Sequence, residues 1–194
     1  MKAILTMNDD IFGEKFSEEQ FNNVEISNIS INDSEFNNTN MSNSTIKNVQ
    51  FDKVTFTKCD LSNVKFIDCS FRNVTFNNCK LLGTNIISSR LTQVNILESL
   101  CRYLNLVELK IKKSNINNCD LTESSFYNLE LNKFDMQDSN LTGSEFFHTS
   151  LKGIDLSTCK ISGIKITPDV LKGAKVNMIQ AVELVELLGV EIVD

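Results

Sequence analysis

A large apolar residue occupies every fifth position along most of the chain. In the stretch 45–80 these centres are mainly phenylalanine, and the pattern runs without insertion or deletion from Ile11 to Val176 if Cys101 is counted as apolar. A period of five matches neither the 3.6-residue period of an amphipathic helix nor the two-residue alternation of a flat strand. A short repeat sustained over this length is typical of a solenoid, in which each repeat packs on the next.

A second inward position lies two residues before each centre. From Val24 to Ile164 it holds only Ser, Thr, Cys, Val, Ile, Leu or Phe, and the other three positions of each repeat are mostly polar. Charge reaches the inward position only outside that stretch, at Glu14, Glu19 and Asp169. Because an unpaired charge is costly to bury, we expect regular coiling to stop near these residues. This predicts an N-terminal cap over residues 1–19 and a solenoid over residues 20–176.

The five-residue pattern resembles the pentapeptide-repeat family, whose consensus is roughly a small or β-branched residue, then Asp or Asn, then Leu or Phe, then two variable residues. The resemblance covers about residues 20–176. It implies an all-β solenoid, a right-handed quadrilateral β-helix in which four repeats form one square coil. Each corner then requires unusual backbone angles, and Gly and Asn tolerate a positive φ best. Every Gly before Gly189 lies two positions after a centre, as do Asn residues such as Asn63 and Asn78.

The chain after Val176 changes to a helical spacing. Asn177 and Gln180 form a capping-box pattern, and Gly189 suits the C-terminal stop. The apolar residues that recur at helical spacing are Ala181, Leu184, Val185 and Leu188. We expect a short helix from about Asn177 to Leu188 that buries this face against the open end of the rod, against a second copy, or against both. Residues 177–194 are therefore predicted to form a C-terminal helix and tail that serve dimerisation.

The C-terminal sequence also resembles the ending of Qnr-type quinolone-resistance proteins and their MfpA-like relatives. The matching segments are Gly163-Ile164-Lys165-Ile166, Gln180-Ala181 and Leu187-Leu188-Gly189-Val190. The resemblance implies a homodimer joined through the C-terminal helix, which looks like duplex DNA, binds DNA gyrase or topoisomerase IV and protects it from quinolones. Qnr-type proteins of Gram-negative bacteria carry two projecting loops, for which the uninterrupted register here leaves no room. MfpA-like members lack such loops.

With 20 residues in each coil, every residue is assigned to one of four faces, and the charges sort by face. One face is net acidic, and a DNA-mimicking protein would bind its partner there through Glu98, Asp135, Asp138 and Asp155. The preceding face is basic although the formal net charge of the protein is −6. Its cations are Arg72, Arg90, Lys110, Lys112, Lys113, Lys133, Lys152 and Lys172. A merely solvated face is the alternative interpretation of this basic face.

A third face carries an apolar residue directly after the centre in five successive coils. These residues form a predicted apolar ladder: Ile67, Ile87, Val107, Tyr127 and Phe147. An ordered apolar stripe on a surface often marks an interaction site, although side chains of neighbouring coils also stack on one another. The ladder supports a second hypothesis, a dimeric scaffold that recruits an unknown protein partner.

The remaining chemistry argues against an enzyme. The chain has one histidine, His148, and no nucleophile–base motif, phosphate loop or paired-carboxylate motif, so we expect no catalytic residue, cofactor or metal. The six cysteines occupy repeat positions, which favours free structural thiols. Residues 1–10 do not resemble a signal peptide and no apolar run is long enough to span a membrane. We therefore expect a cytoplasmic protein that contacts neither a membrane nor nucleic acid directly.

Overall fold

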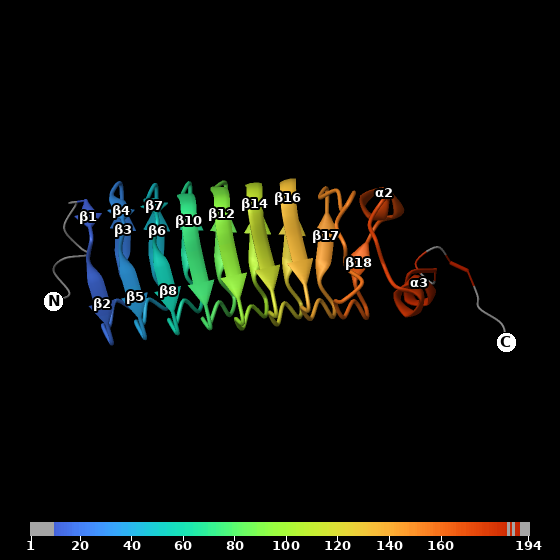
Figure 1. The fold of residues 1–194 in the computed structure, drawn as a ribbon, viewed down its shortest axis with the longest axis horizontal. Coiled ribbons are helices and arrows are strands. Elements are labelled where there is room, and N and C mark those ends of the chain that lie inside the picture. The colour runs from blue at the N-terminus through green and yellow to red at the C-terminus, as the bar shows by residue number, and fades with distance from the viewer. Residues whose placement is uncertain (1–9, 186, 188, 191–194) are drawn as a thin grey trace.

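The chain forms a straight rod of stacked parallel coils that ends in two short helices (Figure 1). This computed structural model describes every residue except 1–9, 186, 188 and 191–194. Each strand pairs in parallel with the strand 20 residues later, as in the pairs Phe51 with Phe71 and Ile67 with Ile87. The prediction of a β-solenoid of pentapeptide repeats with a short C-terminal helix is confirmed.

Two parallel sheets and a row of bridges form the sides of the rod. The ten-stranded sheet covers two adjacent faces and contains β1 (Ile11–Phe12), β2 (Lys15–Ser17), β4 (Ser30–Asn32), β5 (Glu35–Asn37), β7 (Gln50–Asp52), β8 (Thr55–Thr57), β10 (Ser70–Asn77), β12 (Arg90–Leu97), β14 (Lys110–Asn117) and β16 (Glu130–Gln137). The eight-stranded sheet contains β3 (Glu25–Ser27), β6 (Thr45–Lys47), β9 (Lys65–Ile67), β11 (Asn85–Ile87), β13 (Asn105–Val107), β15 (Ser125–Tyr127), β17 (Glu145–Phe147) and β18 (Lys165–Ile166). The remaining face is held by single parallel bridges, such as Asp60 with Lys80.

Aromatic stacking along the axis explains the five-residue repeat. The centres Phe16, Phe36, Phe56 and Phe76 stack with ring centroids 4.7–4.9 Å apart, which matches the spacing of neighbouring strands. The centres from Ile11 to Phe126 and most later ones are buried, so the column forms a continuous narrow core. Three later centres are partly buried against it: Leu131, Leu171 and Val176. The corners adopt a positive φ two residues after a centre, for example 58° at Asn63 and 62° at Gly83.

The N-terminal end is more regular than the inward charges predict. Strands β1 and β2 pair with β4 and β5 in the 20-residue register, so the prediction that coiling stops at Glu14 and Glu19 is wrong. Glu14 is exposed and its backbone N–H donates to the Ser34 hydroxyl in the next coil. The inward position of this first coil is thus exposed at Glu14 and half-buried at Glu19. A separate cap over residues 1–19 stays a prediction.

The C-terminal end leaves the coil at the predicted place. Helix α2 (Pro168–Leu171) begins directly after β18, with Asp169 in its first turn. Helix α3 (Met178–Val185) follows, and it lies within the predicted range from Asn177 to Leu188. Leu188 itself lies outside the described residues. In the described part of the chain, no helix combines the length and apolarity that crossing a bilayer requires.

Candidate interaction surfaces

The apolar ladder exists as a continuous row along the eight-stranded sheet. The register places Ile67, Ile87, Val107, Tyr127 and Phe147 on directly neighbouring strands. The first three are half-buried, whereas Tyr127 and Phe147 are 42% and 38% exposed. The ring of Tyr127 also packs edge-on against His148 at 5.7 Å. The alignment of the ladder is confirmed, and its role in binding a partner stays a prediction.

On one side of the ladder the middle part of the surface is uncharged, whereas Asp68 and Glu108 follow the ladder residues on the other side. Two residues before the ladder positions, the same strands carry Asn85, Asn105 and Ser125 in one row. Asn105 donates its side-chain amide to the Asn85 side-chain oxygen at 3.1 Å, which holds the two amides flat against the sheet. A flat strip of apolar and neutral polar groups can bind a partner without the desolvation of charge.

The structure separates the predicted acidic residues into two groups. Glu98 and Asp138 line one shallow groove of about 400 Å³ at a corner of the rod, together with Asp120. Asp135 lies in β16 opposite Asn115, and Asp155 pairs by its backbone with Lys175. Acidic side chains therefore occupy both a groove and the adjoining flat face, rather than one compact cluster.

The acidic residues are largely left as free carboxylates. Within the described part of the chain, none of Glu98, Asp135, Asp138 and Asp155 belongs to an ion pair. The side chain and the backbone N–H of Ser157 hydrogen-bond to Asp155 and lower the pKa of that carboxyl. The four side chains are therefore available to an external partner.

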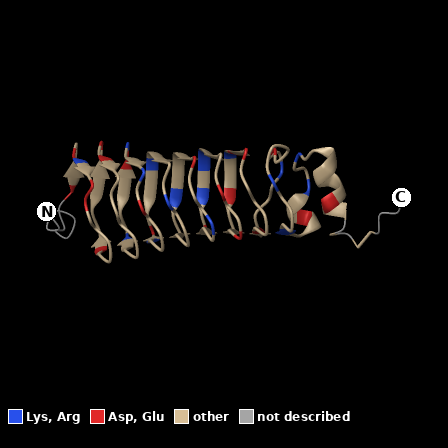
Figure 2. Cartoon of the chain, turned by 90° about the horizontal axis from the view of Figure 1, so that it is seen from below, with Lys and Arg blue, Asp and Glu red and all other residues tan. Residues whose placement is uncertain are grey.

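The basic face is divided by ion pairs between coils. Near the N-terminus, Lys53 pairs with Asp33 at 3.3 Å, and Arg72 pairs with Asp52 at 2.6 Å. Farther along, the same face keeps a row of exposed cations, which we call the basic strip: Arg90, Lys110, Lys112, Lys113, Lys133, Lys152 and Lys172. Figure 2 shows Lys and Arg on the middle strands of the face turned toward the viewer. Sequence reasoning finds the cations but not the pairing that neutralises one end of the face.

Helix α3 is fixed to the end of the rod by Gln180 and Leu184. Both side chains are buried, and Gln180 Nε2 donates to the backbone carbonyl oxygens of Leu156 and Cys159. Of the other predicted dimerisation residues, Ala181 is exposed and Val185 is half-buried. Leu184 therefore packs mainly on its own chain.

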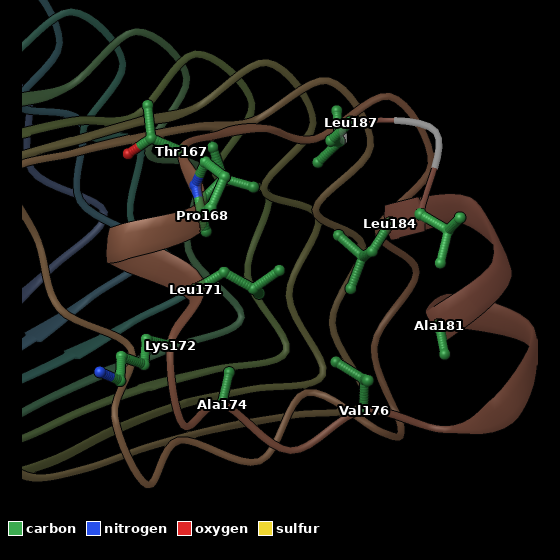
Figure 3. Close-up of a pocket in the computed structure, with 11 residues that line it drawn as sticks. Thr167, Pro168, Leu171, Lys172, Ala174, Val176, Ala181, Leu184 and Leu187 are labelled. Atoms are coloured by element: carbon green, nitrogen blue, oxygen red, sulfur yellow. The ribbon is translucent and has the colours of Figure 1, made fainter. Parts of the chain in front are cut away.

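Sequence reasoning missed the apolar residues that this end of the rod leaves exposed. Met178 is 85% exposed, Ile179 is 74% exposed and Val182 is 49% exposed. From the sequence, dimerisation is assigned to the apolar residues at helical spacing, and part of that face instead packs against the rod. The exposed residues lie on the other side of the helix. Beside them, an apolar groove of about 430 Å³ lies between α2 and α3. Figure 3 shows Leu171, Ala174, Val176, Ala181 and Leu184 around it.

The cysteines lie inside the rod rather than at a reactive site. All six are free and buried. Burial raises the pKa of Cys69 to about 11, and the neighbouring thiol of Cys59 together with burial raises the pKa of Cys79. Thiols in this state are poor nucleophiles at neutral pH. Among the described residues, no group of three or more His, Cys, Asp and Glu side chains is placed to hold a metal ion.

Comparisons with known proteins identify the repeat. Residues 50–118 match the family model "Pentapeptide repeat region", and residues 105–143 match "Pentapeptide repeats (8 copies)". No curated protein sequence matches the chain.

Two solved structures represent the structural matches. A trypsin-treated form of QnrB1, a plasmid-mediated fluoroquinolone resistance protein, aligns with a TM-score of 0.49 and 20% identity, and covers 97% of this chain and 100% of that chain. HetL, a pentapeptide repeat protein involved in heterocyst differentiation regulation from the cyanobacterium Nostoc sp. Strain PCC 7120, aligns with a TM-score of 0.37 and 13% identity, covering 86% of this chain and 87% of that chain.

Proposed function

Because this chain is a pentapeptide-repeat protein, we propose that it acts by binding rather than by catalysis, as a DNA-mimicking ligand of a type II topoisomerase. The enzyme would be DNA gyrase or topoisomerase IV, and the bound rod would protect it from quinolones. The proposal places the protein in the cytoplasm, where these enzymes work. It starts from the resemblance of the C-terminal sequence to Qnr-type and MfpA-like proteins.

The observation that carries the proposal is the set of free carboxylates on one side of a rigid rod. Glu98, Asp135, Asp138 and Asp155 lie over several successive coils, and no described residue neutralises them in an ion pair. A protein groove that holds duplex DNA is lined by cations that bind phosphates. Such a groove attracts ordered carboxylates by the same long-range electrostatics.

The end of the rod supports the proposed dimer. Met178, Ile179 and Val182 expose apolar surface on α3, and water exposure of such a patch is unfavourable unless a partner covers it. Two rods joined at this end would form a longer rod of formal net charge −12, twice −6. Replacing Ile179 with Asp should give a monomer in light scattering without unfolding the rod. A wild-type protein that is monomeric at high concentration contradicts the dimer.

The acidic face is tested by charge reversal in a gyrase supercoiling assay. The variant Asp135→Lys, Asp138→Lys, Asp155→Lys should lose inhibition of supercoiling and protection from quinolone. The control variant Glu25→Lys, Asp68→Lys, Glu108→Lys makes the same change in net charge on the face of the ladder and should keep both effects. If wild type affects neither gyrase nor topoisomerase IV, the proposed function is wrong.

A second candidate function rests on the apolar ladder. Tyr127 exposes aromatic surface next to the neutral side chain of Ser125. Phe147 extends this surface beside Glu145, which pairs with Lys165 at 2.6 Å. Exposed aromatic rings are frequent at the centre of protein interfaces. In this alternative the protein is a dimeric scaffold whose ladder recruits a protein partner other than a topoisomerase. The two candidates differ in salt dependence, because binding through carboxylates weakens as salt rises and binding through the ladder does not.

A further inference from the structure

The basic strip is positively charged because its cations outnumber its carboxylates, as the distribution of ion pairs shows. On the N-terminal part of the same face, Asp33 and Asp52 neutralise cations of the next coil at 3.3 Å and 2.6 Å. Within the strip, Lys110 pairs with Glu130 at 3.3 Å. No other ion pair between described residues involves the strip, which leaves a set of uncompensated cations: Arg90, Lys112, Lys113, Lys133, Lys152 and Lys172.

The cations are arranged in rows that follow the rod axis. One row contains Arg90 and Lys110, which pair directly on the neighbouring strands β12 and β14. A second row, two residues farther along each strand, contains Arg72 and, two coils later, Lys112. Successive coils are separated by the strand spacing, so the strip from Arg90 to Lys172 is roughly 20 Å long. One strand of duplex DNA presents a phosphate every ~3.4 Å along the helix axis, and the strip therefore spans several phosphates.

The strip lacks the groups that read single strands. Exposed aromatic rings, on which unpaired bases stack, occur on other faces of the rod at Tyr103, Tyr127 and Phe147. Phe12 is exposed on the same face, but it lies in the first coil, four coils before β12, and is outside the strip. The strip itself offers ammonium and guanidinium groups on a flat sheet, which contact phosphates without reading bases. Its chemistry therefore favours the backbone of a duplex over a single strand.

We propose that the basic strip binds the phosphate backbone of duplex DNA without sequence preference. From the sequence we expect no direct nucleic-acid contact, and the formal net charge of −6 averages over faces that the fold keeps apart. Strand β16 shows this separation within a few residues, because Lys133 belongs to the strip and Asp135 belongs to the acidic face. The proposal does not rest on topoisomerase binding, since the strip and the acidic face are different surfaces.

The test is fluorescence anisotropy of the full-length protein with a fluorescein-labelled duplex over a range of salt concentrations. If about four cations contact phosphates, affinity should fall roughly a hundredfold between about 50 mM and 200 mM salt. The variant Lys112→Gln, Lys113→Gln should bind more weakly and reduce the slope of log affinity against log salt by about two. The control variant Lys47→Gln, Lys65→Gln removes the same charge from the face of the ladder and should bind like wild type.

Each other outcome overturns the proposal. If the wild-type protein does not bind the duplex at low salt, the proposal is wrong. It is also wrong if the two double variants lose the same amount of affinity, because binding would then respond to net charge alone. Unlabelled poly-L-glutamate of matched charge serves as competitor. If it displaces the duplex equally well, the strip is a site for acidic polypeptide and not for DNA. Thermal unfolding of each variant, followed by circular dichroism, verifies that the rod is intact.

Discussion

Asn177 and Gln180 cap helix α3 reciprocally. The backbone N–H of Gln180 donates to Asn177 Oδ1 at 3.0 Å, and the backbone N–H of Asn177 donates to Gln180 Oε1 at 2.8 Å. The Nε2 atom of Gln180 donates to the carbonyl oxygens of Leu156 and Cys159 at 2.8 Å and 2.7 Å. One buried side chain therefore both starts the helix and ties it to the last complete coil.

Replacing Gln180 with Leu should destabilise the C-terminal end of the rod. The change leaves the carbonyl oxygen of the buried residue Cys159 without its partner and removes one of the two hydrogen bonds that the Leu156 carbonyl oxygen accepts. An unsatisfied buried group costs about 1–3 kcal/mol. Amide hydrogen exchange should show faster opening of α3, while the coils around Phe56 keep their protection. The control Gln137→Leu alters an exposed glutamine of β16 and should leave exchange in α3 unchanged. Unchanged protection of α3 in Gln180→Leu contradicts the role assigned to this side chain.

The capping box shows what the sequence can predict at this end and what it cannot. Asn177 and Gln180 have a local signature, because their two contacts lie three residues apart in the chain. The contacts of Gln180 with Leu156 and Cys159 have no such signature, since they join segments more than 20 residues apart. The exposure of Ile179 likewise depends on how the helix is turned against the rod, which Gln180 determines.

The solenoid itself was predictable because its periodicity makes distant contacts regular. Once 20 residues form a coil, the neighbours of Ile87 are known to be Ile67 and Val107, and the ladder follows. The N-terminal limit was not predictable in the same way. A charge such as Glu14 is excluded from the interior of a rod but tolerated in a terminal coil, and the sequence alone does not show where the stack ends.

Phe71 and Phe12 provide a matched test of burial on one face of the rod. Phe71 is 1% exposed and stacks on Phe51 at 4.9 Å, whereas Phe12 is 72% exposed. Phe71→Asp places an unpaired charge in the core and leaves a cavity, so we expect a loss of about 4 kcal/mol or more in the free energy of unfolding. Phe12→Asp should change it by less than about 0.5 kcal/mol. Similar melting temperatures for both variants in circular dichroism would show that the centres are not buried.

The ion pair between Arg72 and Asp52 should make stability depend on acid pH. Hydrogen bonds from Arg72 are the main cause that lowers the pKa of Asp52 in the folded state. A group whose folded pKa is lowered stabilises the fold above its unfolded pKa near 3.8, and this contribution disappears as pH falls through the lower folded value. Arg72→Gln should therefore lower the free energy of unfolding at neutral pH. Below about pH 3 the difference in the free energy of unfolding between this variant and wild type should become smaller. The effect should be small because the Arg72 side chain is 65% exposed to solvent, which screens the pair.

Urea unfolding at a series of pH values measures this difference. Arg90→Gln, which alters a cation outside any ion pair of the described residues, is the control and should show no such narrowing. A difference between Arg72→Gln and wild type that stays constant from neutral to strongly acid pH argues against a contribution from the ionised Asp52.

Removing the exposed apolar groups of the ladder should separate the two candidate functions. The variant Val107→Ser, Tyr127→Ser, Phe147→Ser takes away apolar surface in three aligned coils, and its parallel backbone pairing does not depend on these side chains. If the protein binds a topoisomerase through its carboxylates, the variant should inhibit supercoiling like wild type. A loss of inhibition in this variant, with inhibition retained in Asp135→Lys, Asp138→Lys, Asp155→Lys, assigns binding to the ladder and rejects DNA mimicry. Circular dichroism of the variant is needed beside the assay, because Tyr127 and Phe147 also shield the sheet beneath them.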